Sequence, residues 1–351
     1  MNNKLELDGN KLLHHIPAIN RWKQEELVYP IMVEISPVGY CNQKCIFCAY
    51  DYLKSQKTVL KRERLLEVLD EFAYLGVKSV FFSGEGEPLL HPDLAEFINH
   101  AKKNGLECAL NTNGIALTKN VGDNILKDLS WIRFSINAGT NESYQRIHRA
   151  GKGSFGCILQ NLENAVHTKL KNNLGVTLGV QLVYIGQPLE EIQKLVHILK
   201  SIGIDYFTVK MFNKHPLISF KPEGEMLSYE ELRKIEALSE NNFYVLVRQH
   251  FSPTENGRAY KRCYGLDFFA ELQSDGHFCP CGPLLGIKKY NYGNIYENSF
   301  EEIWTGKLRQ EILERMECTI NTAECMGNCR LNSINNLLWS IKHEPFHVNF
   351  I

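Results

Sequence analysis

The sequence has no marked excess of either charge and no long apolar run. Its 39 Lys and Arg residues nearly balance its 40 Asp and Glu residues, and the formal net charge is −1 at pH 7. We therefore expect no binding to nucleic acid or to an anionic membrane surface. No apolar segment reaches the ~18 residues that a membrane-spanning helix needs, and the polar N-terminus lacks a signal-peptide core. These absences predict a cytoplasmic protein.

The sequence also lacks low-complexity tracts, short repeats and the cysteine content of a disulfide-bonded secreted protein. Its 11 cysteines are few for 351 residues, and they are clustered. In a reducing compartment, clustered cysteines indicate metal ligands.

Three cysteines lie on one short segment directly after an apolar run. Cys41, Cys45 and Cys48 have the spacing CxxxCxxC and follow the strand-like segment Ile31–Ser36. A [4Fe–4S] cluster that only transfers electrons takes four protein thiolates, so three thiolates leave one iron open. An open position is typical of a catalytic metal site. From the spacing alone, part of a zinc site is the alternative.

Strand-like and helix-like segments alternate from residue 31 to residue 211. The strand-like segments are Ile31–Ser36, Lys78–Ser83, Leu106–Asn111, Trp131–Asn137, Val176–Tyr184 and Tyr206–Met211. The helix-like segments are Leu60–Leu75, Asp93–Asn104, Asn120–Leu129, Ser154–Lys171 and Leu189–Ile202. This alternation predicts parallel βαβ units in an α/β fold. Six strands favour an open, partial barrel, whose functional residues belong at the carboxyl ends of its strands.

The chain is long enough for two hydrophobic cores. We expect residues 1–30 to form a leader segment, with a helix over Asn20–Leu27 that is closed by Pro30. Residues 31–216 form the predicted barrel. The βα pattern fades after residue 216, so residues 217–351 are predicted to form a smaller domain.

Polar and glycine-rich motifs accompany the second, third and fourth predicted strands. They are Ser83–Pro88 with the sequence SGEGEP, Asn111–Gly114 with the sequence NTNG, and Ser135–Asn137. Glycine lets the backbone approach a ligand closely, and hydroxyl and amide groups can hydrogen-bond a ribose or a carboxylate. The alternatives are a plain Gly/Pro turn and asparagine residues that cap the following helices.

Together these motifs resemble the radical S-adenosylmethionine (SAM) enzymes. The three cysteines, with Phe47 directly before Cys48, are similar to that family's signature loop, and residues from about Ile31 to Met211 are similar to its core. The resemblance implies a partial (β/α)6 TIM-like barrel and a [4Fe–4S] cluster whose open iron chelates the methionine part of SAM. It also implies an external one-electron donor, such as flavodoxin or ferredoxin, and a 5'-deoxyadenosyl radical that abstracts a hydrogen atom.

The same resemblance assigns SAM contacts by motif. Phe47 should lie against the adenine, and Gly86 and Glu87 of the SGEGEP segment, which is similar to the family's GGEP motif, should hold the methionyl ammonium. Glu85 is inserted relative to that motif, and its direction stays open between solvent and substrate. The remaining implied SAM-binding residues are Asn113, Ser135, Asn137 and Arg149.

Polar residues near the fifth and sixth predicted strands are candidates for substrate contact. They are Gln181, Lys210, Asn213, Lys214 and His215. For Lys214 and His215, a solvated charged loop is the favoured interpretation over substrate contact.

Most of the remaining cysteines lie in the C-terminal region, at positions 263, 279, 281, 318, 325 and 329. Their spacing, with Gly276 ahead of Cys281 and a helix-like Ser299–Trp304 further on, resembles the SPASM and twitch extensions of radical SAM enzymes. The full two-cluster pattern needs a CxxC pair ahead of the final cysteines and a cysteine after Cys329, and this sequence has neither.

One auxiliary [4Fe–4S] cluster is therefore predicted in this extension. Its expected ligands are Cys263, Cys281, Cys325 and Cys329, with Cys318 as the first substitute and Cys279 as the second. A zinc site built from the same thiolates is the alternative.

Two metal centres predict an enzyme that forms a radical and has an electron acceptor nearby. Dehydrogenation follows if the auxiliary cluster accepts an electron, and epimerisation follows if a thiol returns a hydrogen atom. The residues leave both open, and the uncommitted thiols are Cys108, Cys157, Cys279 and Cys318.

The substrate is predicted less directly. The 40 residues ahead of Cys41 are too short for a leader-binding domain, which favours a polar small molecule, such as a sugar or aminocyclitol, over a ribosomal peptide. A peptide maturase is the first alternative, and a non-enzymatic iron–sulfur or zinc-binding protein is an alternative of another class.

Overall fold

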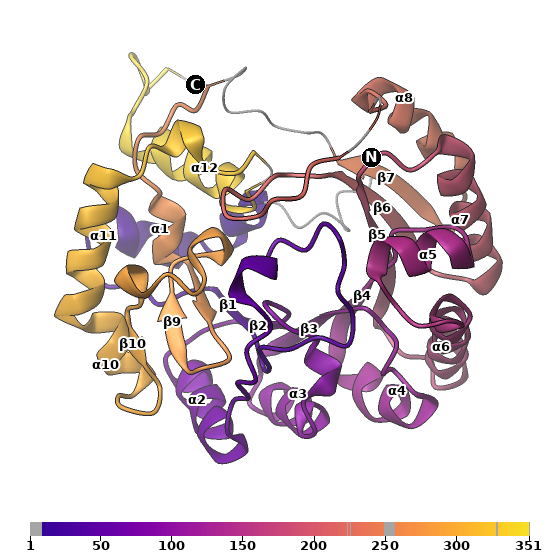
Figure 1. The fold of residues 1–351 in the computed structure, drawn as a ribbon. Helices are drawn as coiled ribbons and strands as arrows, with labels where there is room; N and C mark the ends of the chain where they lie inside the picture. The colour runs from indigo at the N-terminus through magenta and orange to yellow at the C-terminus, as the bar shows by residue number, and fades with distance from the viewer. Residues whose placement is uncertain (1–8, 223, 225, 249–256, 328, 351) are drawn as a thin grey trace.

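A single mixed sheet organises the molecule (Figure 1). The computed structural model describes residues 9–222, 224, 226–248, 257–327 and 329–350. In the described part, the strand order is β10-β9-β8-β1-β2-β3-β4-β5-β6-β7. The strands are β1 (Met32–Ile35), β2 (Ser79–Phe82), β3 (Glu107–Thr112), β4 (Leu129–Ser135), β5 (Thr177–Tyr184), β6 (Tyr206–Met211), β7 (Tyr244–Arg248), β8 (Phe269–Leu272), β9 (His277–Cys279) and β10 (Gly293–Asn294).

Strands β1 to β8 all pair in parallel, and β9 and β10 add antiparallel pairs beyond β8. The predicted α/β partial barrel is therefore confirmed, and all six predicted strands are present. The sheet also extends on both sides of these six, because β7 pairs with β6 and β8 pairs with β1. Sequence analysis did not predict either of these two strands.

Helices cover the outer face of the curved sheet (Figure 1). The helices are α1 (Ile16–Lys23), α2 (Arg62–Tyr74), α3 (Leu94–Lys103), α4 (Lys119–Ile125), α5 (Asn141–His148), α6 (Ser154–Lys171), α7 (Leu189–Ile202), α8 (Tyr229–Arg233), α10 (Phe300–Thr305), α11 (Lys307–Thr319) and α12 (Leu331–Lys342). Successive side chains along a strand point to opposite faces of the sheet. Val33 and Ile35 of β1 are fully buried in the core beneath the helices, so Glu34 between them faces the barrel interior.

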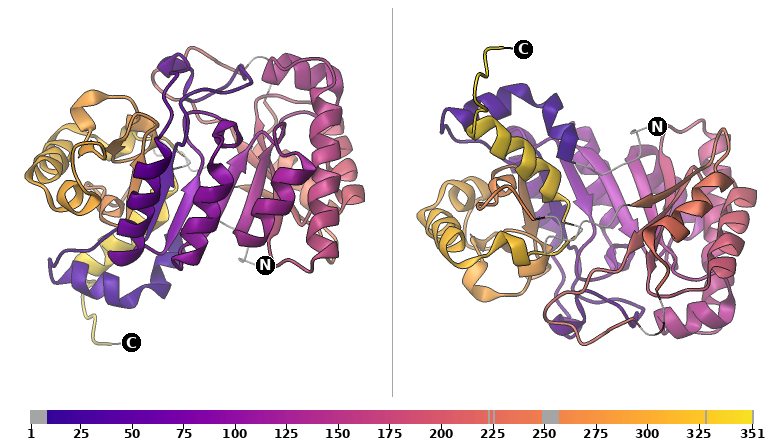
Figure 2. Two further views of the ribbon diagram at one scale, coloured as in Figure 1. Left: turned by 90° about the horizontal axis from the view of Figure 1, so that it is seen from below. Right: turned by 90° about the horizontal axis from the view of Figure 1, so that it is seen from above.

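The N-terminal segment that carries α1 packs against the C-terminal helix α12 beside the barrel (Figure 2). Trp22 of α1 and Leu338 of α12 belong to a second, smaller hydrophobic cluster. Helix α1 lies at Ile16–Lys23 rather than at the predicted Asn20–Leu27, because Pro17 occupies its first turn, where a proline fits a helix N-terminus.

Among the described residues, no helix combines the length and the hydropathy that a membrane crossing requires.

Candidate active site

The three N-terminal cysteines lie on the loop between β1 and α2, at the carboxyl end of β1. Cys41 is exposed, and Cys45 and Cys48 are partly buried. Burial, together with the nearby Cys48 and Cys41 thiols, raises the pKa of the Cys45 thiol. Because neighbouring thiolates repel one another, a cationic cluster core would stabilise them together. The three thiols therefore fit a shared iron–sulfur centre.

A single-ion site finds no support in the described part of the chain. No group of three or more His, Cys, Asp or Glu side chains there converges tightly enough to hold one metal ion.

Gly86 lies directly against the backbone of the cysteine loop. A Cβ atom on Gly86 would lie 2.5 Å from the Tyr40 carbonyl oxygen and closer still to that of Val38. The backbone N–H of Glu87 donates a hydrogen bond to the same Tyr40 oxygen at 2.9 Å. Only glycine permits this approach. The segment after β2 therefore supports the loop that carries the cysteines.

Replacing Gly86 with alanine should displace the cysteine loop. The added methyl group meets backbone atoms that cannot move aside cheaply, so we expect a loss of about 1–3 kcal/mol of unfolding free energy. Iron bound after anaerobic reconstitution should fall with it. The matched control is Gly156→Ala in α6, where a new Cβ meets nothing within 4 Å. Equal iron content and equal melting temperature for Gly86→Ala and the wild type would show that the loop tolerates the methyl group.

Glu87 joins the ends of β2 and β3. Its buried carboxylate accepts hydrogen bonds from Leu89 N at 3.1 Å, Thr112 Oγ1 at 2.6 Å and Asn113 N at 2.7 Å. Burial raises the pKa of Glu87, and these three bonds oppose that rise. A bound ammonium group would share oxygens that already hold the site together.

Asn113, a predicted SAM contact, lies beside the cysteine loop. Its Nδ2 donates to Asn42 Oδ1 at 2.6 Å and lies 3.8 Å from Cys41 Sγ. Sequence analysis did not single out Asn42, because a lone asparagine between cysteines carries no distinguishing signal.

Glu85, whose direction the sequence left open between solvent and substrate, is half-buried. Its Oε1 accepts a hydrogen bond from the backbone N–H of Ser274, between β8 and β9, at 2.7 Å. Glu85 therefore ties the end of β2 to the C-terminal region.

The other predicted SAM contacts have different surroundings. Ser135 ends β4 and is paired with Gln181 of β5. Asn137 is buried, and its Oδ1 accepts from Val183 N at 2.5 Å. Arg149 is exposed and ends α5 with a left-handed φ of 46°. Asn137 thus links the segment after β4 to β5, while Arg149 is exposed at the end of α5.

His148 is a buried member of the site that sequence analysis missed. Its Nδ1 lies 3.2 Å from Cys45 Sγ and 3.1 Å from Gln43 Oε1. Its ring stacks on Tyr144, with centroids 4.2 Å apart, and Phe47 packs edge-on against it at 6.2 Å. Burial lowers the pKa of His148 to about 3, so the ring is neutral. Only its position four residues after Tyr144, on the same helix face, could have indicated it.

Two glutamates line the interior wall of the barrel near the C-terminal region. Glu34 of β1 pairs with Arg330 at 2.6 Å. Glu271 of β8 is buried, and both of its carboxylate oxygens lack a hydrogen-bond partner in the described part of the chain. Burial and the Glu34 charge raise the pKa of Glu271. A Cβ on Gly282 would lie 3.1 Å from the Tyr50 hydroxyl and 3.5 Å from Glu271 Oε2, so these groups share one space.

Basic residues face the interior from the other strands. Lys210 of β6 is paired with Arg248 of β7. Burial, followed by the charges of Arg248, Arg330 and Arg133, lowers the pKa of Lys210 to about 8. Lys210 stays a candidate for substrate contact, and its ammonium group lies among the other basic side chains.

The residues after β6 divide between surface and interior. Lys214 is exposed, as expected of a solvated loop. His215 is buried, stacks on Tyr52 at 4.8 Å and lies 3.1 Å from the Pro283 carbonyl oxygen through its Nε2. The solvated-loop interpretation is therefore wrong for His215, which packs between the cysteine loop and the C-terminal region.

Four C-terminal thiols influence one another. Burial and the Cys329 charge raise the pKa of Cys263, and Cys325 contributes to the same rise. Burial raises the pKa of Cys281, with further contributions from Cys329, Cys263 and Cys325. This mutual influence fits the predicted ligand set of the auxiliary cluster.

The two substitute ligands are placed differently. Cys279 of β9 is buried, and burial followed by the charge of Glu271 raises its pKa. Cys318 is exposed on α11. Cys279 therefore lies toward the barrel interior, while Cys318 faces away from the four-thiol group.

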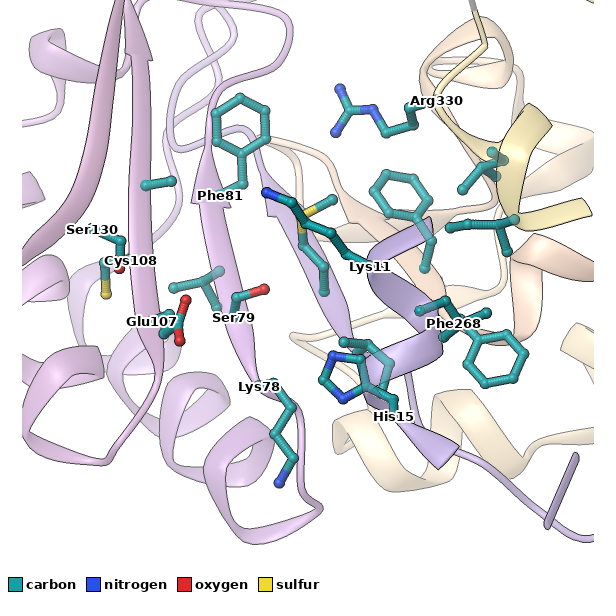
Figure 3. Close-up of a pocket in the computed structure, with 18 of the residues that line it drawn as sticks. Lys11, His15, Lys78, Ser79, Phe81, Glu107, Cys108, Ser130, Phe268 and Arg330 are labelled. Atoms are coloured by element: carbon teal, nitrogen blue, oxygen red, sulfur yellow. The ribbon is translucent and has the colours of Figure 1, made fainter. Parts of the chain in front are cut away.

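A cavity of about 280 Å³ lies at the opposite, N-terminal ends of β1 to β4 (Figure 3). Lys11, His15, Lys78 and Glu107 border its mouth, and Arg330 lies at its inner end. The Arg330 guanidinium covers the rings of Phe81 at 5.5 Å and Phe269 at 5.4 Å. Because the cysteine loop is at the carboxyl ends of the strands, we assign neither SAM nor substrate to this cavity.

Two protein-family models match the chain. Radical SAM superfamily matches residues 35–199, and the iron–sulfur cluster-binding domain SPASM matches residues 263–332. Among curated relatives, the tungsten-containing aldehyde ferredoxin oxidoreductase cofactor-modifying protein of Pyrococcus furiosus is 22% identical over 76% of this chain and 78% of its own length. A PqqA peptide cyclase of Granulibacter bethesdensis is 24% identical over 76% and 71%. A Fe-coproporphyrin III synthase of Methanosarcina barkeri is 24% identical over 85% and 78%.

Solved structures share the fold over most of the chain. SuiB of Streptococcus suis, bound to its precursor peptide SuiA, has a TM-score of 0.67 at 18% identity and covers 86% of this chain and 71% of its own. Native anSMEcpe with bound AdoMet has a TM-score of 0.61 at 17% identity and covers 87% and 88%.

Proposed function

Since the chain is a radical SAM protein with a C-terminal SPASM domain, we propose that it is a maturase that modifies a ribosomally made peptide. Proteins with these domains use SAM and [4Fe–4S] clusters. When bound, the N-terminal cluster and SAM supply a 5'-deoxyadenosyl radical, and the auxiliary cluster supplies an electron acceptor. Cys41, Cys45 and Cys48 would hold the first cluster, and the four C-terminal thiols the second.

The comparisons give no support to the sugar or aminocyclitol substrate that the short N-terminal segment favoured. They favour the peptide alternative, because the relatives include a PqqA peptide cyclase and the structural neighbours include SuiB with its precursor peptide. These names describe those proteins, and for this chain they support a proposal.

Glu271 is the observation that carries the proposal within the molecule. Its carboxylate, which has no hydrogen-bond partner among the described residues, lies beside Tyr50, two residues after Cys48, and beside Gly282, directly after Cys281. A buried carboxyl group without partners is costly, so a bound substrate should supply them. Peptide N–H groups are suitable donors. The space between the two cysteine groups therefore fits a segment of peptide backbone.

The positions of the free thiols leave one candidate hydrogen donor for an epimerisation. Cys108 is fully buried in the hydrophobic core, and Cys157 and Cys318 are exposed on α6 and α11. None of these three lies beside Glu271, so only Cys279 is placed near it. We propose a net oxidation of the peptide, in which Glu271 would receive a substrate proton and the auxiliary cluster would accept the electron.

A substrate screen tests this proposal directly. Anaerobically reconstituted protein, SAM and a chemical reductant are incubated with peptides encoded next to the chain's own gene, with sugars and aminocyclitols, and with an iron porphyrin. We expect a peptide to accelerate 5'-deoxyadenosine formation and to lose two hydrogens by mass spectrometry. Acceleration by a sugar or porphyrin, with no response to any peptide, would overturn the proposal. In heavy water, deuterium on the product carbon would indicate epimerisation instead.

A further inference from the structure

His148 has no role in the motifs, yet it is in direct contact with the cysteine loop. We propose that His148 donates a hydrogen bond from Nδ1 to the Cys45 sulfur and thereby raises the reduction potential of the N-terminal cluster. This inference rests on the part of the proposed function that makes Cys45 a cluster ligand. It does not depend on which substrate the enzyme modifies.

Both neighbours of Nδ1 are hydrogen-bond acceptors. Cys45 Sγ lies 3.2 Å away, and Gln43 Oε1 lies 3.1 Å away. The Gln43 amide is oriented by its own Nε2, which donates to the Tyr144 hydroxyl at 2.9 Å. Its oxygen therefore faces His148. A thiolate sulfur and an amide oxygen can both be satisfied only if Nδ1 carries a proton.

The other ring nitrogen, Nε2, accepts hydrogen bonds and so carries no proton. The backbone N–H of Asn137 donates to Nε2 at 3.2 Å, and the Asn137 amide nitrogen lies 3.3 Å from it. The Asn137 amide is oriented in turn, because its Oδ1 accepts from Val183 N at 2.5 Å. With acceptors beside Nδ1 and the Asn137 backbone N–H donating to Nε2, the hydrogen bonds place the single proton of a neutral ring on Nδ1. The hydrogen-bond network assigns this tautomer.

The ring is also fixed in place relative to the loop. It stacks on Tyr144 at an interplanar angle of 20°, and Phe47 packs against its edge. The His148 carbonyl oxygen accepts from Lys44 N at 3.1 Å, so the backbone that carries the ring also holds the loop next to Cys45. The donor is therefore positioned before any cluster binds, which limits the entropy lost when the hydrogen bond forms.

A hydrogen bond to a ligand sulfur changes the redox balance of a cluster. Reduction adds negative charge that is shared with the thiolates, and an N–H donor stabilises that charge more strongly after reduction than before it. Because the ring is neutral, it shifts the potential through the hydrogen bond alone. His148 is thus a positioning residue that makes the N-terminal cluster easier to reduce.

Potentiometric titration followed by EPR tests the inference with two variants. His148→Leu removes the donor, and His148→Asn keeps an amide N–H at the reach of Nδ1. At a fixed potential, we expect His148→Leu to reduce the ratio of reduced to oxidised N-terminal cluster roughly tenfold, which is about 59 mV for a one-electron couple. His148→Asn should recover most of that loss. The auxiliary cluster serves as an internal reference whose potential stays constant.

Two results would overturn the inference. One is an unchanged potential in His148→Leu. The other is an equal loss in His148→Asn and His148→Leu, which would indicate a packing role.

If His148→Leu fails to assemble its cluster, the wild type still provides a test. Pulsed EPR of the reduced protein grown with 15N-histidine should detect a histidine nitrogen coupled to the N-terminal cluster, and absence of that coupling would contradict the proposed bond. These readouts need no substrate. A failed peptide screen with a shifted potential would therefore count against the maturase proposal alone.

Discussion

We expect Cys45→Ala to abolish 5'-deoxyadenosine formation and to remove half of the bound iron. With two [4Fe–4S] cubes, the reconstituted wild type should hold about eight irons per chain, and the variant about four. Two thiolates on a partly exposed loop cannot hold a cube that needs three protein ligands, so the radical chemistry should stop rather than slow. Iron analysis and chromatography of the SAM cleavage products provide the measurement.

Cys157→Ala is the matched control for this experiment. Cys157 is an exposed thiol on α6, away from the cysteine loop, so iron content and SAM cleavage should equal those of the wild type. SAM cleavage by Cys45→Ala at the wild-type rate would remove the radical hypothesis.

Cys281→Ala should remove the auxiliary cluster and keep the N-terminal cluster, the reverse of Cys45→Ala. This substitution should also leave about four irons, but they are now those of the N-terminal cluster, so SAM cleavage persists. The peptide product should not form, because the electron acceptor is lost. Cys281 is the thiol whose pKa is influenced by all three of the other predicted auxiliary ligands. Its removal should therefore affect that cluster strongly.

Cys318→Ala is the control that also tests the ligand set. Cys318 is exposed on α11, and we expect its removal to change neither iron content nor product formation. If Cys318→Ala loses iron while Cys325→Ala keeps it, Cys318 replaces Cys325 as the ligand. A stable count of about four irons in the wild type would exclude the auxiliary cluster.

The barrel could be predicted because its signals are local. Helices and strands between residues 31 and 211 can be predicted from hydrophobic periodicity, because each segment contains its own pattern of apolar residues. β7 and β8, which extend the sheet beyond the six predicted strands, have weaker sequence patterns. β8 is only Phe269–Leu272 and contains the charged Glu271, and β7 follows a segment without a helix-like pattern of comparable length. Their pairing with β1 and β6 depends on tertiary contacts that no single segment reveals.

The residues of the candidate site also differ in whether their signal is local in the sequence. The cysteine loop and the SGEGEP segment are compact motifs, so their residues could be named from the sequence. His148 contacts Cys45 across 103 positions, and Glu85 reaches Ser274 across 189. Single His and Glu residues at such separations look like any other polar residue. Their roles arise only when the strands bring their ends together, and the same holds for the partnerless carboxylate of Glu271.

Mössbauer spectroscopy of 57Fe-reconstituted protein, with and without SAM, tests most directly whether the N-terminal cluster keeps one iron open for SAM. Adding SAM should change the signal of one iron, about one-eighth of the total for two cubes, because its amino and carboxylate groups occupy the open position. A spectrum in which no iron responds to SAM, or a protein that takes up zinc in place of this cluster, would contradict the proposed site.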